Sequence, residues 1–322
     1  MTQPKKDSTL IRTKSAKCFV VCLFFCYFAQ TNVLWRMNIS VDKLHIYTLN
    51  VGQASHHGDW NWKNVRSPFA RIFYVTEGSA RVEMPSGTYD LKPDRLYYIP
   101  AFTTHSYECE ANFSLYYIHV YEEPDREQGV LEEWELPFEV EGTEMDRALI
   151  ARLCEINPFM KLPQSDPAVY DNHPTLITNL QINQRRPFCD KVESRGILFL
   201  LLSRFLKTAK PKVEVKDDRI HQVLTFIRKN LDKRIDVDML SSKCCMSKDH
   251  FIRVFKQEMG VTPNLFVIQK KMERSELLLV TTAEPLKAIA DALGYDDYSY
   301  FNRIFKKHVG ITPQQYREKY AV

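Results

Sequence analysis

The sequence has little cysteine, and its cysteines are not arranged for a disulfide framework or a metal site. Eight cysteines occur among 322 residues, and no CxxC pair is present. Three of them, Cys18, Cys22 and Cys26, lie within the first 36 residues, and Cys244 and Cys245 are adjacent on an apolar-periodic segment. Because disulfide frameworks and zinc sites need cysteines at paired spacings, both classes are excluded. The pattern indicates buried thiols in a reducing, cytoplasmic protein.

Long apolar runs are also missing. The segment KCFVVCLFFCYFA follows Lys14 and resembles the hydrophobic region of a signal peptide. It is shorter than the ~20 residues of a membrane span, and no small-x-small cleavage site follows it. We expect residues 1–36 to be translated upstream sequence, with the native protein starting at Met37. A weak membrane anchor is the alternative, and the intact mass of the native protein distinguishes the two.

The formal net charge of +4 is small but unevenly distributed. Residues 217–322 carry 18 Lys and Arg against 14 Asp and Glu, whereas residues 37–216 carry 20 against 25. The basic C-terminal part suits a nucleic-acid partner, and the acidic middle does not. A chain of this length predicts two domains.

One pattern of thirteen residues occurs twice, as FIRVFKQEMGVTP from Phe251 and as FNRIFKKHVGITP from Phe301. In each copy, phenylalanines four residues apart predict the apolar stripe of a helix. The glycine then suits a helix end, and Thr-Pro suits the start of the next helix. Arg253 lies about 200° around the helix from Phe251, so it faces away from the core. Two copies that keep Arg and Lys opposite the apolar stripe favour a shared binding surface over an ordinary solvated face.

A short apolar-periodic segment precedes each copy, VDMLSSKCCMSKD before the first and PLKAIADALGYDDYS before the second. A short helix, a tight turn and a helix with an outward basic face form a helix-turn-helix pattern. IADALGYDDYSYFNRIFKKHVGITPQQYREKY (289–320) then resembles the signature of the AraC/XylS family of transcription regulators. The first copy matches less well, because Ser241 stands where Ala is common and Cys245 replaces the turn glycine.

The resemblance covers residues 217–322 closely and the rest of the chain loosely. It implies a DNA-binding domain at 218–322, with one helix-turn-helix at about 236–259 and another at about 286–309. NLFVIQKKMERSELLLV (264–280) has a helical pattern and a length of about 25 Å. Since successive major grooves lie about 34 Å apart, such a connector can place two recognition helices on one side of a duplex.

Residues near the start of each recognition helix are expected to reach base edges, because recognition helices enter the major groove by that end. Arg can pair with guanine and Asn with adenine, and Lys256 and Lys306 are expected at phosphates. By resemblance, the DNA-binding set is Asp249, Ile252, Arg253, Lys256, Tyr298, Ser299, Asn302, Arg303 and Lys306.

Between His45 and about Glu122, short alternating segments are separated by turn residues such as Pro-Ser-Gly and Lys-Pro-Asp. About eight antiparallel strands favour a double-sheet jelly roll, similar to the cupin-like sensor domain that many AraC-type regulators carry. The predicted fold class is therefore α+β. It combines a cupin-like barrel at 37–142 with helices and an all-α C-terminal domain of two helix-turn-helix motifs joined by a linker helix.

A cupin-type enzyme is the least favoured alternative, because no His-x-His cluster is present. His56 and His57 are adjacent, so on a strand they would face opposite sides, and their segment is interpreted as a loop. We predict no catalytic residue, no metal site and no cofactor. The barrel is instead expected to hold a small effector, a carbohydrate or metabolite by analogy, with Trp60 and Trp62 able to close its mouth. The candidate effector-binding residues are Arg71, His105, Tyr107, Tyr117 and His119.

Residues 143–208 have a helical pattern, and the run ILFLLL (197–202) is either a helix packed on the barrel or a dimer seam. Similarity to AraC-type proteins favours the seam, and 209–217 is the expected linker. The prediction is a cytoplasmic, homodimeric regulator, activating rather than repressing, that binds promoter DNA, an effector and RNA polymerase but no membrane. A DNA-binding protein whose barrel only dimerises is the open alternative.

Overall fold

The computed structural model describes residues 41, 44–122, 129–167, 173–213 and 215–319. The predicted leader 1–36 and the predicted start at Met37 lie outside the described residues. From Leu44 onward, the described residues belong to one compact unit. Within them, no helix is long and apolar enough to cross a membrane.

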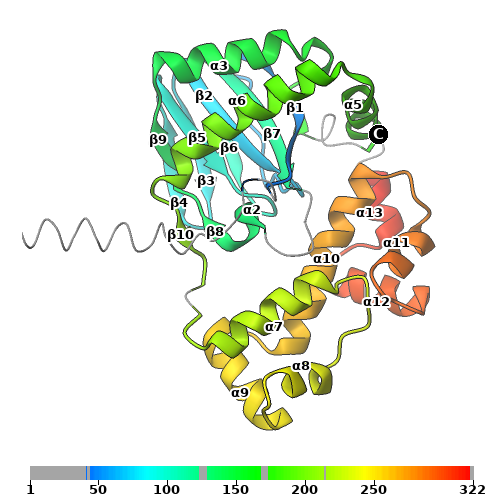
Figure 1. Ribbon diagram of the computed structural model, residues 1–322. Helices are drawn as coiled ribbons and strands as arrows, with labels where there is room; N and C mark the ends of the chain where they lie inside the picture. Colours follow the sequence, from blue (N-terminus) through cyan, green and yellow to red (C-terminus); the bar gives the residue numbers. More distant parts are fainter. Residues whose placement is uncertain (1–40, 42–43, 123–128, 168–172, 214, 320–322) are drawn as a thin grey trace, which may run out of the picture. The chain divides into compact units, whose positions relative to one another are not determined.

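Two antiparallel sheets form the barrel of the N-terminal part (Figure 1), beside a short two-stranded pair. The larger sheet has the strand order β1 (Ile46–His57), β7 (Asn112–Glu122), β2 (Ala70–Gly78), β5 (Arg95–Ile99) and β9 (Glu139–Glu141). The smaller sheet has the order β4 (Gly87–Leu91), β3 (Ala80–Met84) and β6 (Ser106–Glu108). These two sheets, together with the helical C-terminal part, confirm the predicted α+β fold class.

The core lies between the two sheets, because alternate side chains of each strand point to one face. Phe73 and Val75 of β2, Val82 of β3 and Tyr107 of β6 are all buried there. The opposite face of the larger sheet is apolar as well, with Ile72 and Ile118 fully buried. That second apolar face requires a cover of helices.

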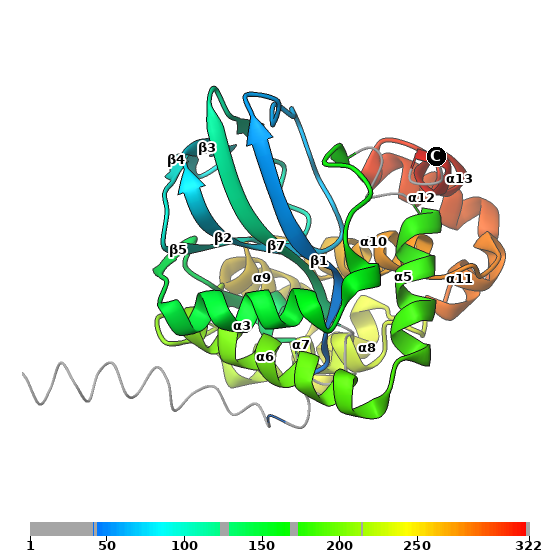
Figure 2. The same ribbon diagram turned by 90° about the horizontal axis from the view of Figure 1, so that it is seen from above.

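Two helices, α3 (Glu144–Glu155) and α6 (Phe188–Leu206), run across this face of the larger sheet (Figures 1 and 2). Four residues of the predicted 197–202 run are buried here: Ile197, Leu198, Leu201 and Leu202. Phe205 continues the row and packs on Tyr98, with ring centroids 5.8 Å apart. Of the two interpretations of the run, packing on the barrel therefore accounts for most of it, and Leu200 points outward.

The remaining elements of this part are short apart from one helix. They are α2 (Val130–Glu133), β8 (Trp134–Glu135), the 3₁₀ helix η2 (Pro158–Met160), α5 (His173–Arg185) and β10 (Lys210–Pro211). β10 pairs with β8, so the expected linker 209–217 contains a two-residue strand that its sequence did not indicate. Helix α5 contacts both β1 and α10 (Pro263–Thr281).

The C-terminal part contains two helix-turn-helix units joined by α10. The first unit consists of α8 (Val237–Lys243) and α9 (Lys248–Met259), preceded by α7 (Asp218–Lys229). The second consists of α11 (Leu286–Ala292) and α12 (Tyr298–Val309), followed by α13 (Pro313–Lys319). α9 ends at Gly260 with φ 74° and α12 at Gly310 with φ 93°, the left-handed conformation that glycine adopts without steric cost.

Candidate DNA interface and effector pocket

The two recognition helices bury one face and expose the other. Phe251 and Phe255 of α9 are completely buried, as are Phe301 and Phe305 of α12. The opposite faces carry most of the predicted DNA contacts. Exposed are Asp249, Arg253, Lys256, Ser299, Arg303 and Lys306, and partly buried are Ile252, Tyr298 and Asn302. The repeat therefore places an arginine and a lysine on corresponding outward positions of both units.

Both arginines have neighbours that hold the guanidinium near the helix surface. Arg253 donates from Nη2 to Nδ1 of His250 at 2.9 Å. The guanidinium carbon of Arg303 lies 5.4 Å from the centroid of the Tyr300 ring. Asp297 caps α12 by accepting from the backbone N–H of Ser299 at 2.7 Å. The exposed guanidinium groups remain able to form the two parallel hydrogen bonds that guanine accepts.

The two turns place different residues at their left-handed position. Gly294 has φ 68°, and Cys245 occupies the corresponding place with φ 52°. A Cβ on Gly294 would lie 2.5 Å from the backbone of Lys233, whereas Cys245 is exposed. The first unit therefore tolerates a side chain where the second does not, which explains why the weaker sequence match still forms a turn.

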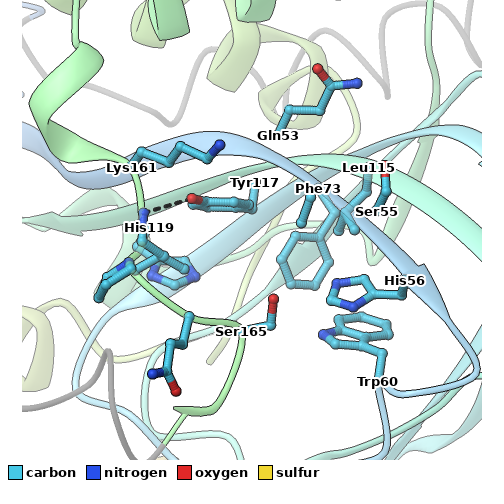
Figure 3. A pocket seen from close by; sticks show the side chains of 14 residues that line it. Gln53, Ser55, His56, Trp60, Phe73, Leu115, Tyr117, His119, Lys161 and Ser165 are labelled. Carbon is cyan, nitrogen blue, oxygen red and sulfur yellow. Dashed lines mark hydrogen bonds between the residues drawn. The ribbon is translucent and has the colours of Figure 1, made fainter.

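A pocket of about 270 Å³ opens at one end of the barrel (Figure 3). Its walls come from β1, from Phe73 of β2, from Leu115, Tyr117 and His119 of β7, and from residues 161–165 after η2. The backbone N–H of Leu162 donates to the Tyr117 hydroxyl at 2.8 Å, which ties the loop wall to the sheet. Lys161 and Ser165 supply polar groups, and Trp60 and Phe73 supply apolar rings. This composition suits a small polar ligand.

Only two of the five candidate effector residues line this pocket, Tyr117 and His119. Arg71, His105 and Tyr107 are buried beside it in the barrel wall. The Tyr107 hydroxyl bonds Nε2 of His105 at 2.7 Å, and Nδ1 of His105 lies 2.8 Å from the carbonyl of Thr103. Since a carbonyl only accepts, Nδ1 carries the proton and Nε2 accepts from the tyrosine.

The histidines of this wall are held neutral. Burial, and then the nearby positive charge of Arg71, lower the pKa of His105 to about 3. The same two causes hold the pKa of His119 well below its ordinary value. A neutral imidazole has one donor and one acceptor, so His119, the one of the two that lines the pocket, suits hydroxyl groups rather than anions.

Trp60 was expected to close the mouth, but it is part of the pocket wall. It is 5% exposed and lies between Tyr107, at 4.1 Å between ring centroids, and His56, at 5.6 Å. His56 lies on strand β1 and not on the expected loop; it faces inward, and His57 faces outward. Both faces of the Trp60 ring are therefore occupied, which leaves its edge for a ligand.

Several pocket residues were not anticipated from the sequence. Ala54 and His56 alternate along β1 on its inward face, a pattern that period-2 analysis could have found. Residues 161–165 lie in an irregular segment without periodicity, so no sequence signal marked them. Among the residues with described positions, no group of three or more His, Cys, Asp or Glu side chains is placed to hold a metal ion.

A two-sheet barrel with a polar pocket and a pair of helix-turn-helix units define a DNA-binding protein with a ligand domain. Two family models match the chain accordingly. A model described as the AraC-like ligand binding domain matches residues 51–162, and one described as a helix-turn-helix domain matches residues 240–319. The chain belongs to the AraC/XylS family of transcription regulators, as the resemblance in the sequence implied.

Individual relatives match over part of the chain. A probable transcriptional regulator LumQ from Photobacterium leiognathi is 31% identical over 32% of this chain and 43% of its own length. The arabinose operon regulatory protein of Escherichia coli K12 is 28% identical over 31% of this chain and 35% of its own length. The chain thus spans less than half of these relatives. The solved C-terminal domain of the response regulator yesN from Fusobacterium nucleatum is 31% identical, with a TM-score of 0.31 over 31% of this chain and 99% of that one.

Proposed function

We propose that this protein is a ligand-responsive transcription regulator that binds promoter DNA through both helix-turn-helix units, in two successive major grooves. The observation that carries the proposal is the duplicated exposed Arg and Lys pair, Arg253 with Lys256 and Arg303 with Lys306, opposite buried phenylalanines. Activation of transcription through RNA polymerase, in the cytoplasm, is the direction we propose from family resemblance.

The proposed DNA contacts are the nine residues of α9 and α12 predicted from the sequence. Arg253 and Arg303 would specify bases, with Asn302 and Ser299 as further polar contacts. Lys256 and Lys306 would bind phosphates and fix the register of each unit. Ile252 and Tyr298 are partly buried, so their contribution would be apolar contact at the groove edge.

Genomic DNA selection with the purified full chain tests this proposal. We expect a bipartite motif with blocks about one helical turn apart. Arg253→Ala should remove information from one block and Arg303→Ala from the other, and Arg185→Ala, an exposed arginine of α5, should leave both intact. A single block lost only with Arg303→Ala would mean that the first unit merely positions the second.

We propose that the effector binds in the 270 Å³ pocket and contacts Tyr117 and His119, with Lys161 and Ser165 as additional polar groups. Hydroxyl, imidazole and ammonium groups together favour a small polyhydroxylated carbohydrate or metabolite. Arg71, His105 and Tyr107 would act indirectly, by holding the wall that carries His119; β2 and β7 pair with Arg71 opposite His119.

Thermal shift with a panel of sugars and metabolites tests for the effector. A ligand at 100 times its Kd should stabilise the protein by about 2.7 kcal/mol. Tyr117→Phe should weaken that response, and Tyr89→Phe, outside the lining of this pocket, should not. A panel without any response would favour the alternative in which the barrel only dimerises.

Ion pairs between the ligand-domain helix α2 and the DNA-binding part could transmit the ligand signal. Glu132 bonds Nζ of Lys270 in α10 at 3.1 Å and Nε of Arg228 in α7 at 3.5 Å. Glu133 bonds Nη1 of Arg228 at 3.0 Å. We propose that the ligand shifts the equilibrium between an arrangement in which these ion pairs are formed and one in which they are broken. Such a shift requires that the ligand bind the two arrangements with different affinity.

We propose a homodimer through the outward face of α6. Phe188, Val192 and Leu200 are 81%, 53% and 55% exposed on that helix. Three large apolar side chains on one helix are the usual mark of an interaction surface. Leu200→Glu should shift sedimentation equilibrium toward the monomer, and Gln181→Glu on α5 should not. A monomeric wild-type protein would remove the dimer from the proposal.

A further inference from the structure

The connector helix α10 carries a buried lysine near its middle. Lys271 is 4% exposed. Its ammonium group donates to the backbone carbonyl of Lys233 at 2.7 Å and to that of Leu293 at 2.6 Å. It also lies 4.9 Å from the centroid of the Tyr295 ring. All of its described polar contacts therefore go to backbone or ring, and none to a carboxylate.

The two acceptor carbonyls belong to different helix-turn-helix units. Lys233 lies between α7 and α8, whose buried residues belong to the apolar cluster of the first unit. Leu293 is the C-cap of α11 in the second unit, directly before the turn. At that turn the two backbones touch, since a Cβ on Gly294 would lie 2.5 Å from the carbonyl carbon of Lys233. Lys271 is thus bonded to both units at their junction.

Apolar packing alone would not need a lysine here. Burying an ammonium group is costly, and burial holds the pKa of Lys271 at about 8, although Asp232 and Asp296 favour its charged form. A well-packed apolar side chain of similar volume is often as stable as a buried charge or more so. What the ammonium adds is direction, because hydrogen bonds to two fixed carbonyls define an orientation that apolar contact leaves free.

We propose that Lys271 is a positioning residue that fixes the orientation of the second helix-turn-helix unit relative to the first. It thereby sets the spacing of the two DNA blocks that one chain binds. This inference rests on the two-groove function proposed above. Arg253 and Arg303 would then determine which bases are recognised, and Lys271 would determine how far apart they lie.

Binding to three DNA duplexes tests the consequence for spacing. The first carries both selected blocks at their selected spacing, the second has one base pair added between them, and the third carries one block only. We expect wild-type protein to prefer the first over the second by ~10-fold or more. Lys271→Met should lose most of that preference while keeping its single-block affinity. Lys233→Met, which removes an exposed charge but keeps the acceptor carbonyl, should behave like wild type.

A distance measurement tests the inference without DNA. Spin labels introduced through an unnatural amino acid at positions 256 and 306 of the full chain should give a narrow distance distribution in the wild type and a broader one with Lys271→Met. An unchanged distribution, or equal losses on all three duplexes, would overturn the role of Lys271. A third outcome is a broader distance distribution with Lys271→Met together with wild-type protein that binds the two-block and one-block duplexes equally well. That outcome would support the positioning role of Lys271 but contradict both the two-groove function and the spacing role.

Discussion

The turn residues Cys245 and Gly294 adopt the same left-handed conformation with different neighbours, and substitutions there should have opposite effects. A side chain in this conformation costs about 1–2 kcal/mol, which the entropy of glycine in the unfolded chain partly offsets. Cys245→Gly should therefore raise the free energy of unfolding by about 0.5–1 kcal/mol. Gly294→Ala should lower it by about 3 kcal/mol, because strain adds to the contact with Lys233 at 2.5 Å.

Urea unfolding of both variants measures these differences, and the second variant is the sharper test. A Gly294→Ala protein as stable as the wild type would mean that the Lys233 segment moves aside freely. In that case the backbone at the junction between the two units would shift more easily than its close contacts indicate.

The neutral histidines of the barrel wall predict sensitivity to acid. The pKa values of His105 and His119 are lower in the fold than in the unfolded chain, so the unfolded chain binds more protons below pH 6.5. Each histidine then costs about 1.4 kcal/mol per pH unit as the pH falls. Burial raises the pKa of Glu122 to about 7, so this residue opposes one histidine between pH 7 and 4.5. The two histidines outweigh this carboxylate, so stability should fall as the pH drops from 6.5 to 4.5.

Urea titrations at several pH values check the sign and the slope. His105→Gln should flatten the dependence, whatever its effect on stability at pH 7.5. An unchanged slope in this variant would mean that His105 is not the group that takes up the proton on unfolding.

At the scale of elements, the start of α3 depends on one buried carboxylate. Asp146 accepts from the backbone N–H of Thr143 at 2.8 Å and pairs with Arg204 of α6 at 3.4 Å. Asp146→Ala should cost about 2–3 kcal/mol, because it removes a cap and leaves a partly buried arginine without this partner. Arg152→Ala, which breaks an exposed pair with Glu193 at 2.7 Å, should cost much less than Asp146→Ala. Thermal unfolding of the two variants compares them directly, and equal losses would contradict this ranking.

The elements also show what sequence patterns can and cannot predict. Strands β2 to β7 lie within the stretch from His45 to about Glu122 where alternating segments were predicted, and α10 agrees with the predicted helix 264–280 to within one residue at each end. Helix α5 lies inside the predicted helical region 143–208, although HPTLITNLQINQR contains a Pro, two Thr and two Asn, and it contacts β1 and α10. Local propensity could not reveal those distant partners.

Some site residues could be predicted from local sequence patterns, and others could not. Tyr117 and His119, two of the candidates named from the sequence, are two residues apart on β7 and therefore share the face that lines the pocket. Alternation could not predict that Arg71 and His105 lie outside the pocket lining. Their positions depend on the pairing of β2 with β7 and on the path of the 161–165 segment. The side chains that contact DNA and effector remain predictions, as do the domain boundaries.

At the scale of the whole molecule, the separation of charge predicts salt-dependent DNA binding. The basic part at 217–322 should release counterions from DNA, and log K should fall linearly with log salt. Lys256→Ala and Lys306→Ala should each reduce the slope by about 1, because each removes one phosphate contact. Lys207→Ala, an exposed lysine at the end of α6, should leave the slope unchanged. Fluorescence anisotropy at several salt concentrations measures it, and equal slopes in all variants would remove both lysines from the phosphate set.

The Cys245 turn is exposed and the Gly294 turn is packed against Lys233, so the two units should tolerate substitutions differently during evolution or laboratory selection. Because the Cys245 turn faces solvent, libraries can vary this turn together with the outward residues of α9 while Phe251 and Phe255 keep the core. The Gly294 turn, pressed against Lys233, allows little beyond glycine. New DNA specificities should therefore arise more readily by substitutions in the first unit. The second unit would keep its own DNA block and hold the protein at its site.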